Sequence, residues 1–299
     1  MLHLRYGGDP AARNLLLRAP AGDERGEASD MLAGYAHLDP TDPVAGPSGE
    51  LVIHPAFRGR GYGLLLARAL AAEERRRPLR LWAHGDLPAA GRLAAAAGFE
   101  RVRALWQMRR SLQARLGRPQ LAEGITVRTF EVGRDEDAWI ALNARAFVRH
   151  PEQGAWTRSD LDLREREPWF DPAGFFLAER DGRLVGFHWT KIHRHDHDAG
   201  HEHQGHHAGG EDHVHGHEAI GEVYVVGIDP AERGQGLGRA LTVIGLRYLR
   251  DRGLFQAMLY VDEANTAAIG LYRSLGFTHW GTDVMFALDG AGAAQSPSG

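Results

Sequence analysis

The sequence predicts a mixed α/β-sheet protein built from two tandem repeats. Two glycine-rich segments, 51–63 and 226–238, each pass from strand-like residues through a proline into the pattern Arg-x-x-Gly-x-Gly and then into a helix-like stretch. The second copy follows the first by 175 positions, and a Gly-Phe pair comes later in each repeat, at 98–99 and 276–277. Because the pattern recurs in the same context, two copies of one kind of site are a better interpretation than two unrelated surface turns.

Hydrophobic periodicity and turn residues predict the elements in order. In the first repeat we expect strands at 14–18, 31–37, 50–54, 79–83 and 100–107, and helices at 63–76 and 88–97. In the second repeat we expect strands at 125–130, 175–179, 184–192, 220–228, 257–261 and 282–288, and helices at 136–147, 159–167, 237–250 and 265–274. The predicted domains are therefore 1–110 and 125–288, with a linker at 111–124 and a disordered tail at 289–299.

Composition limits the classes of function. The sequence has no run of 18 apolar residues, and its amino terminus lacks the apolar stretch of a signal peptide, so we expect a cytoplasmic protein without a membrane partner. A net charge of −4 argues against nucleic acid as a partner, and the absence of cysteine excludes thiolate catalysis and disulfides. We expect a monomer that acts on small molecules.

A histidine-rich insertion is predicted at 194–218. Ten of the 17 histidines lie between Lys191 and Glu222. Neutral imidazole binds zinc or nickel, which leaves a metal site open as one interpretation. The histidines alternate with Asp, Glu and Gly in a low-complexity tract, which favours a flexible surface loop and predicts no metal site.

The repeated loop is suited to an anion. Glycines before a helix let the backbone approach a ligand, and the first helical amides lack partners within the helix. Neither copy has the lysine of a Walker loop or the spacing of a dinucleotide fingerprint. Arg-x-x-Gly-x-Gly after a short strand resembles the pyrophosphate loop of the GNAT superfamily of acyl-CoA N-acyltransferases. The resemblance implies two GNAT-like domains, of which the first is truncated at its amino terminus or has a misplaced start codon.

Glu222 is the predicted base. Acyl transfer to an amine needs one because an ammonium group has no lone pair and an α-amine titrates near neutrality. Glu222 lies on the strand that enters the second loop, where regular alternation places Glu222, Tyr224 and Val226 on one face. The alternative is an exposed carboxylate at a strand end.

Tyr272 is the predicted acid. Asn265 and Tyr272 lie two turns apart and share a helix face, and a phenol can protonate the departing thiolate. The alternative is a packed aromatic ring. The first repeat has Pro47 and Ala94 at the positions equivalent to Glu222 and Tyr272, so we expect it to be non-catalytic.

Further motifs cover nearly the whole chain: Trp82-Ala-His-Gly85, Gln107-Met-Arg-Arg110, His150-Pro-Glu-Gln-Gly154, Trp169-Phe-Asp-Pro172, Gly186-Phe-His-Trp-Thr-Lys191, Gly221-Glu-Val-Tyr-Val-Val-Gly227 and Leu259-Tyr-Val261. Together they resemble the mycothiol synthase family, tandem GNAT enzymes of actinobacteria. The resemblance implies acetyl transfer from the co-substrate acetyl-CoA to the cysteinyl amine of Cys-GlcN-Ins, which gives mycothiol and CoA. Lys191 is also the only lysine in the chain.

The same resemblance implies the binding residues. The acceptor would be bound by Glu152, Lys191, Glu222 and Tyr260. Acetyl-CoA in the second repeat would be held by Val226, Gly227, Ile228, Arg233, Gly234, Gln235, Gly236, Leu237, Gly238, Arg239, Asn265, Thr266, Ala267, Ala268, Ile269 and Gly270. A second acetyl-CoA in the first repeat would be held by Leu51, Val52, Ile53, Gly59, Arg60, Gly61, Tyr62, Gly63 and Leu64.

Two other functions stay open. One is a GNAT enzyme that acetylates a peptide or aminoglycoside amine, and the other is an acyl-CoA sensor without catalysis. The predicted acid and base disfavour the sensor, and the set of acceptor residues disfavours the other amines.

Overall fold

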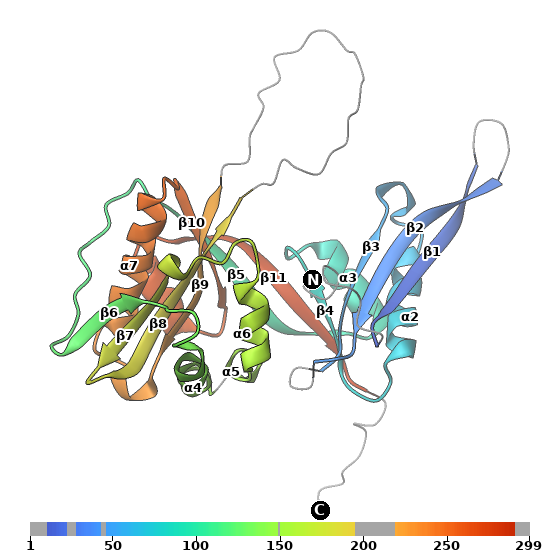
Figure 1. The fold of residues 1–299 in the computed structure, drawn as a ribbon. Coiled ribbons are helices and arrows are strands. Elements are labelled where there is room, and N and C mark those ends of the chain that lie inside the picture. The colour runs from blue at the N-terminus through green and yellow to red at the C-terminus, as the bar shows by residue number, and fades with distance from the viewer. Residues whose placement is uncertain (1–10, 23–27, 43–45, 149, 195–218, 291–299) are drawn as a thin grey trace, which may run out of the picture. The chain divides into compact units, whose positions relative to one another are not determined.

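The computed structural model describes residues 11–22, 28–42, 46–148, 150–194 and 219–290. Contacts divide the chain into two compact units (Figure 1). The first unit comprises residues 1–106, 262–264 and 281–299, and the second comprises 107–261 and 265–280. Most of the histidine-rich tract and the end of the predicted tail lie outside the described residues.

The first unit is a sheet with helices packed on it. Its strand order is β1-β2-β3-β4-β11, from β1 (Arg13–Gly22), β2 (Ala28–Asp39), β3 (Ser48–Ile53), β4 (Leu79–Ala83) and the end of β11 (Thr278–Leu288). The 3-10 turn η1 (Pro55–Phe57) leads to α2 (Tyr62–Glu73), and α3 (Pro88–Ala97) follows β4. Leu17 and Ala19 alternate along β1, as Ala36 and Leu38 do along β2, and these buried side chains form one core with Leu66 and Leu70 of α2.

The second unit carries the fuller sheet, ordered β10-β9-β8-β7-β6. The strands are β6 (Ile125–Thr129), β7 (Phe175–Arg180), β8 (Arg183–His193), β9 (Ile220–Ile228) and β10 (Gln256–Asp262). The helices are α4 (Glu136–Ala146), α5 (Pro151–Gly154), α6 (Arg158–Glu165), α7 (Leu237–Asp251) and α8 (Thr266–Ser274), with 3-10 turns η2 (Pro172–Gly174) and η3 (Pro230–Glu232). Strand β5 (Glu100–Ser111) contributes residues to both units.

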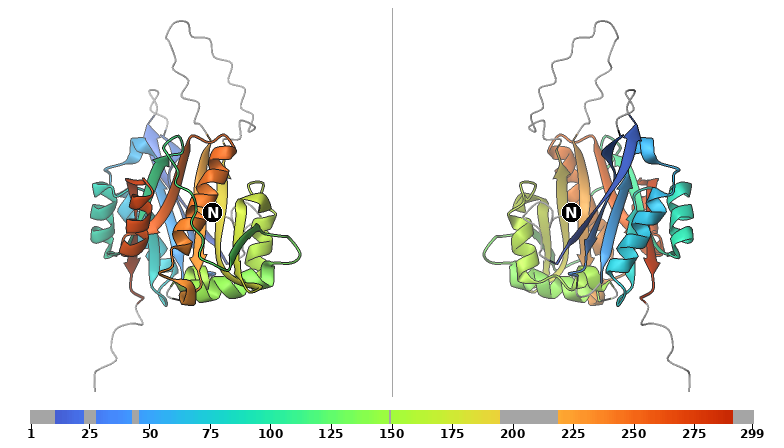
Figure 2. Two further views of the ribbon diagram at one scale, coloured as in Figure 1. Left: turned by 90° about the vertical axis from the view of Figure 1, so that its left-hand side faces the viewer. Right: turned by 90° about the vertical axis from the view of Figure 1, so that its right-hand side faces the viewer.

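Helices cover both faces of the second sheet (Figure 2). On one face, Trp139 of α4 packs edge-on against Trp189 of β8 with ring centroids 5.9 Å apart. On the other face lies α7, where Gly245 leaves room for the buried ring of His188. The sheet is therefore enclosed, as expected for strands that are apolar on both faces.

Local sequence explains where the helices begin. Thr157 caps α6 through a capping box with Asp160, and the side chain of Asn265 accepts a hydrogen bond from the Ala268 amide to cap α8. Gly236 precedes α7 with φ of 80°, a left-handed conformation that disfavours other residues.

The predicted strands and longer helices are present, although several ends differ: β1, for example, runs to Gly22 and not 18. Two further differences concern the organisation of the chain. Strand β5 extends to Ser111, and the following residues Leu112 and Leu116 are buried rather than solvated as in a simple linker. The end of β11, expected in the second domain, pairs with β4 through Val284 and Ala83 and belongs to the first unit. The reason is that β4 gains an antiparallel partner from the end of the chain. The domain limits themselves stay predictions.

No helix among the described residues has both the length and the apolar character needed to cross a membrane.

Candidate active site

In the second sheet, the pairing of β9 with β10 ends just before Tyr224. The parallel register of β9 with β10 joins Gly221, Glu222 and Val223 to Ala257, Met258 and Leu259, and both strands continue beyond these pairs. On the other side of β9, the register with β8 shifts at the same place, because Val223 pairs with Thr190 and Val225 with Trp189. Tyr224 is thus the extra residue of a β-bulge at the point where the strands part, an arrangement common beside active sites.

The bulge corrects one prediction. Regular alternation placed Val226 on the face of Glu222 and Tyr224. In the structure Val226 pairs with His188, whereas Val225 pairs with Trp189, so Val225 follows Tyr224 on the face of Trp189. The cause is the extra residue, which shifts the alternation by one position from Tyr224 onward.

Glu222 lies at this opening and is buried, with 7% of its surface exposed. Its direct partner across β8 is Lys191, so both side chains lie on one face of the sheet. The Nε2 atom of His193 lies 2.7 Å from Oε2 of Glu222. The alternative interpretation, in which Glu222 is an exposed carboxylate at a strand end, is therefore wrong, because Glu222 is buried.

The rings of Trp169 and Tyr224 lie beside the carboxylate and are called the aromatic wall below. The Nζ atom of Lys191 lies 4.5 Å from the ring centroid of Trp169 and 5.5 Å from that of Tyr224. Burial raises the pKa of the Tyr224 phenol, although Arg164 donates a hydrogen bond of 3.3 Å to its oxygen. The wall combines apolar surface with a cation, and this combination suits a polar small molecule held in a fixed orientation.

The second glycine-rich loop has the backbone expected of an anion site. Gly234 and Gly236 have φ of 82° and 80°, and the space next to both is open. Asp229 caps η3 and pairs with Arg145 at 3.0 Å, which fixes the entry of the loop. Arg233, expected to contact the cofactor, donates a hydrogen bond of 2.7 Å to the carbonyl of Ala146. The first amides of α7 thus remain the main candidates for binding an anion.

A cationic cavity of about 400 Å³ adjoins the start of α7. Four arginines line it, together with Gln235 and Gly236, and none of its lining residues is an Asp or Glu. The arginines are Arg110, Arg115, Arg118 and Arg239. Burial lowers the pKa of Arg110, which is 6% exposed. Arg110, Arg115 and Arg118 were not predicted as cofactor contacts. Arg110 ends the motif Gln107-Met-Arg-Arg110, and Arg115 and Arg118 lie in the expected linker.

The first unit repeats the loop without counterparts of the predicted base and acid. Gly59 and Gly61 have φ of 75° and 83°, and the register of β3 with β4 joins only Ser48–Arg80 and Gly49–Leu81 among these described strands. The loop and the early parting of the strands therefore match those of the second unit. Pro47 and Ala94 occupy the positions equivalent to the predicted base and acid.

Three predicted residues lie on other elements of the second unit. Tyr272 lies on α8, edge-on to Phe277 at 5.8 Å, and burial raises the pKa of its hydroxyl to about 12. Tyr260 lies on β10, one residue beyond the paired segment, and its oxygen accepts a hydrogen bond of 2.9 Å from Gln107. Glu152 is exposed on α5.

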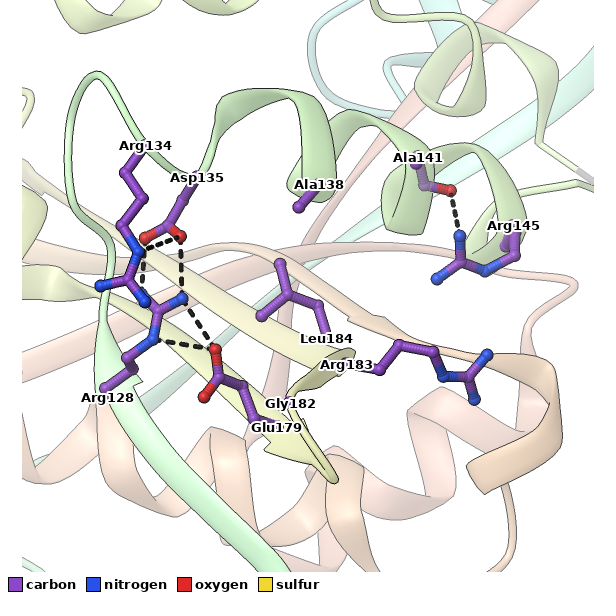
Figure 3. A pocket seen from close by; sticks show the side chains of 10 residues that line it. All are labelled: Arg128, Arg134, Asp135, Ala138, Ala141, Arg145, Glu179, Gly182, Arg183 and Leu184. Carbon is purple, nitrogen blue, oxygen red and sulfur yellow. Dashed lines mark hydrogen bonds and ion pairs between the residues drawn. The ribbon is translucent and has the colours of Figure 1, made fainter.

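A second cavity, of about 450 Å³, lies between α4 and the β7–β8 turn (Figure 3). Its arginines are used in ion pairs: Arg128 contacts Asp135 at 2.5 Å and Glu179 at 2.8 Å. The hydrogen bond with Asp135 raises the pKa of Arg128. These pairs stabilise the sheet edge and provide no proton-transfer group. Among the described residues, no group of three or more His, Asp or Glu side chains forms a metal site.

Known proteins are similar to this chain in sequence. A profile described as the Acetyltransferase (GNAT) family matches residues 138–277. A mycothiol acetyltransferase of Thermobispora bispora is 60% identical, over 96% of this chain and 87% of the relative. A mycothiol acetyltransferase of Acidothermus cellulolyticus is 57% identical, over 100% of this chain and 86% of the relative.

Solved structures share the fold. A GCN5-related N-acetyltransferase from Sphaerobacter thermophilus aligns with a TM-score of 0.65 and 27% identity, over 89% of this chain and 78% of its own. A tandem GNAT protein from the clavulanic acid biosynthesis pathway aligns with a TM-score of 0.64 and 20% identity, over 100% of this chain and 87% of its own. The second likeness concerns the fold alone, and it agrees with two GNAT-like repeats.

Proposed function

The chain belongs to the mycothiol acetyltransferase family of GNAT enzymes, and from this premise we propose that it transfers the acetyl group of acetyl-CoA to the cysteinyl amine of Cys-GlcN-Ins. The products are mycothiol and CoA. The structural observation that carries the proposal is the buried Glu222 at the opening between β9 and β10, on the face of Lys191 and beside the aromatic wall.

Glu222 is the proposed base. Its carboxylate accepts the proton that the acceptor amine loses as the amine nitrogen bonds to the acetyl carbonyl carbon. The bond from that carbon to sulfur then breaks, and CoA leaves as a thiolate that takes a proton from solvent, to which Glu222 returns the proton that it accepted. General base catalysis of this kind typically contributes about 10²–10⁴-fold to the rate.

Tyr272 is the proposed donor to the departing sulfur. Burial raises its pKa to about 12, which keeps the phenol protonated at any working pH. A thiol has a pKa of about 8.5, so the phenol holds its proton more tightly than the thiol product does. The hydroxyl therefore assists mainly by donating a hydrogen bond as the carbon–sulfur bond breaks.

The acceptor is proposed to bind along the aromatic wall. The Lys191 ammonium, above Trp169 and Tyr224, can donate hydrogen bonds to the hydroxyl groups of a sugar. Tyr260 and Glu152 are proposed as the other acceptor contacts. Their support is the position of Tyr260 just beyond the paired part of β10 and the exposure of Glu152.

Acetyl-CoA is proposed to lie along the loop 226–239 and the start of α8. Its pyrophosphate would meet the first amides of α7. The cavity beside that helix adds Arg115 and Arg118 to the predicted residues, because an arginine-lined space without carboxylates suits the phosphate-bearing end of the cofactor. The first unit, with its matching loop but with Pro47 and Ala94, is proposed to bind a second acetyl-CoA without catalysis.

The remaining predictions stand within this proposal: domains at 1–110 and 125–288, a monomer, a cytoplasmic location and no nucleic-acid partner. Their support is the sequence repeat and the composition. Light scattering of the full chain tests the monomer.

The function is tested by mass-resolved acetylation. The purified chain is given acetyl-CoA and either Cys-GlcN-Ins, a peptide amine or an aminoglycoside. We expect a mass increase of one acetyl group on Cys-GlcN-Ins at a kcat/KM well above that of the other amines. Preference for a peptide or an aminoglycoside would overturn the acceptor, and acetyl-CoA binding without any transfer would indicate a sensor.

A further inference from the structure

His193 is the last residue of β8, and it reaches the proposed base. Its side chain is 34% exposed, whereas that of Glu222 is 9% exposed. The contact between Nε2 and Oε2 is 2.7 Å, the length of a strong hydrogen bond to a charged acceptor. The sequence had grouped this histidine with the insertion that follows it, yet the structure pairs it with Ile220 in the sheet.

The side chains of Lys191 and His193, both on β8, make different contacts near Glu222. Lys191 is the direct partner of Glu222 in the register, but its Nζ atom lies over the rings of Trp169 and Tyr224. On the opposite side of β9, the paired residue is Met258, whose side chain cannot donate a hydrogen bond. Among the described residues, the imidazole of His193 is placed to fix one carboxylate oxygen.

We propose that His193 is a positioning residue that holds Oε2 of Glu222 and thereby presents Oε1 to the acceptor amine. A buried carboxylate without such a donor can rotate and can adopt an orientation in which neither oxygen meets the amine. The inference rests on the proposed role of Glu222, since His193 acts only through that carboxylate.

The test compares two side chains of similar length in the full chain. His193→Gln keeps an N–H donor, and His193→Met removes it. We expect His193→Met to lower kcat about 10- to 100-fold, the range for loss of a hydrogen bond to a charged group, with little change in the KM of the acceptor. His193→Gln should retain most of the activity. His279→Ala, at an exposed histidine of β11, is the control and should leave kcat unchanged.

Both substitutions are repeated in a Glu222→Gln background. If His193 acts through Glu222, His193→Met should cause no further loss there, because the effects of residues that act as a unit are not additive. Three results would overturn the inference: a wild-type kcat in His193→Met, equal losses in the Gln and Met variants, or additive losses in the double variant. None of them would contradict the proposed base role of Glu222. A Glu222→Gln enzyme with wild-type kcat would instead overturn the proposed base itself.

Discussion

Lys191 and Glu222 are direct partners across the antiparallel strands β8 and β9. The only lysine of the chain therefore stands on the same face as the buried carboxylate. Its ammonium group lies over the rings of Trp169 and Tyr224, and Oε2 of Glu222 contacts Nε2 of His193. In the proposed function, the lysine binds the acceptor and the glutamate accepts the proton.

Replacement of Lys191 should therefore impair binding more than chemistry. We expect Lys191→Met to raise the KM of the acceptor about 10-fold or more, as for loss of a charged hydrogen-bond donor, with a smaller change in kcat. Lys191→Arg should restore binding only in part, because a planar guanidinium does not replace a compact ammonium. Steady-state kinetics with varied acceptor measures both constants, and an unchanged acceptor KM in the methionine variant would refute this role.

The two glycine-rich loops should respond unequally to the same change. Gly236 and Gly61 have φ of 80° and 83°, so valine causes similar backbone strain at both. We expect Gly236→Val to abolish turnover and Gly61→Val to leave measurable activity. Gly253→Val, at a turn with φ of 83°, controls for strain within the second unit. Equal loss of kcat/KM in the two loop variants would contradict the asymmetry.

Removal of the Tyr272 hydroxyl should lower kcat without recovery in alkali. The pKa of about 12 is raised above the ordinary value of a phenol, so the donor form is present below that pH and is lost only above it. Deprotonation of Tyr272 should accordingly cause no decline in the wild-type kcat up to about pH 11. We expect Tyr272→Phe to reduce kcat uniformly across pH 6–10. Recovery of the variant at high pH would indicate a different role.

Loss of an arginine from the cavity beside α7 should weaken the binding of acetyl-CoA and leave the binding of the acceptor unchanged. We expect Arg118→Ala or Arg115→Ala to raise the KM of acetyl-CoA about 10-fold, by loss of a charge-assisted contact. Arg134→Ala, in the other cavity, is the matched control and should leave the KM of acetyl-CoA unchanged. Acetyl-dephospho-CoA identifies the group that is bound: if the arginines meet the phosphate monoester, the variants should bind this analogue as well as the wild type does.

Much of this architecture could be predicted from local patterns. Periodicity gave strand β9 and helix α7, and the repeated loop gave both positive-φ glycines before a helix. The bulge at Tyr224 could not be predicted, because alternation assumes a regular pleat and a bulge depends on the register with a neighbouring strand. His193 was not predicted for a different reason: it is the first of ten histidines between Lys191 and Glu222, whereas its partner in the fold is Glu222.

Non-local pairing explains the other differences. The end of β11 pairs with β4, and no local signal indicates a strand's partner some 200 positions away in sequence. The cavity beside α7 likewise forms only when the segment 110–120 packs against that helix, through contacts such as the 2.9 Å hydrogen bond from Arg247 to the carbonyl of Gly117.

The base role of Glu222 is tested most directly by the pH dependence of kcat/KM in Glu222→Gln. The account predicts a loss of about 10²–10⁴-fold near neutral pH, which shrinks as pH rises because an acceptor amine that is already deprotonated needs the carboxylate less. The Tyr272→Phe profile, measured in parallel, should show no such recovery. An unchanged kcat in Glu222→Gln, or a defect confined to the KM of the acceptor, would contradict the account and make Glu222 a binding contact.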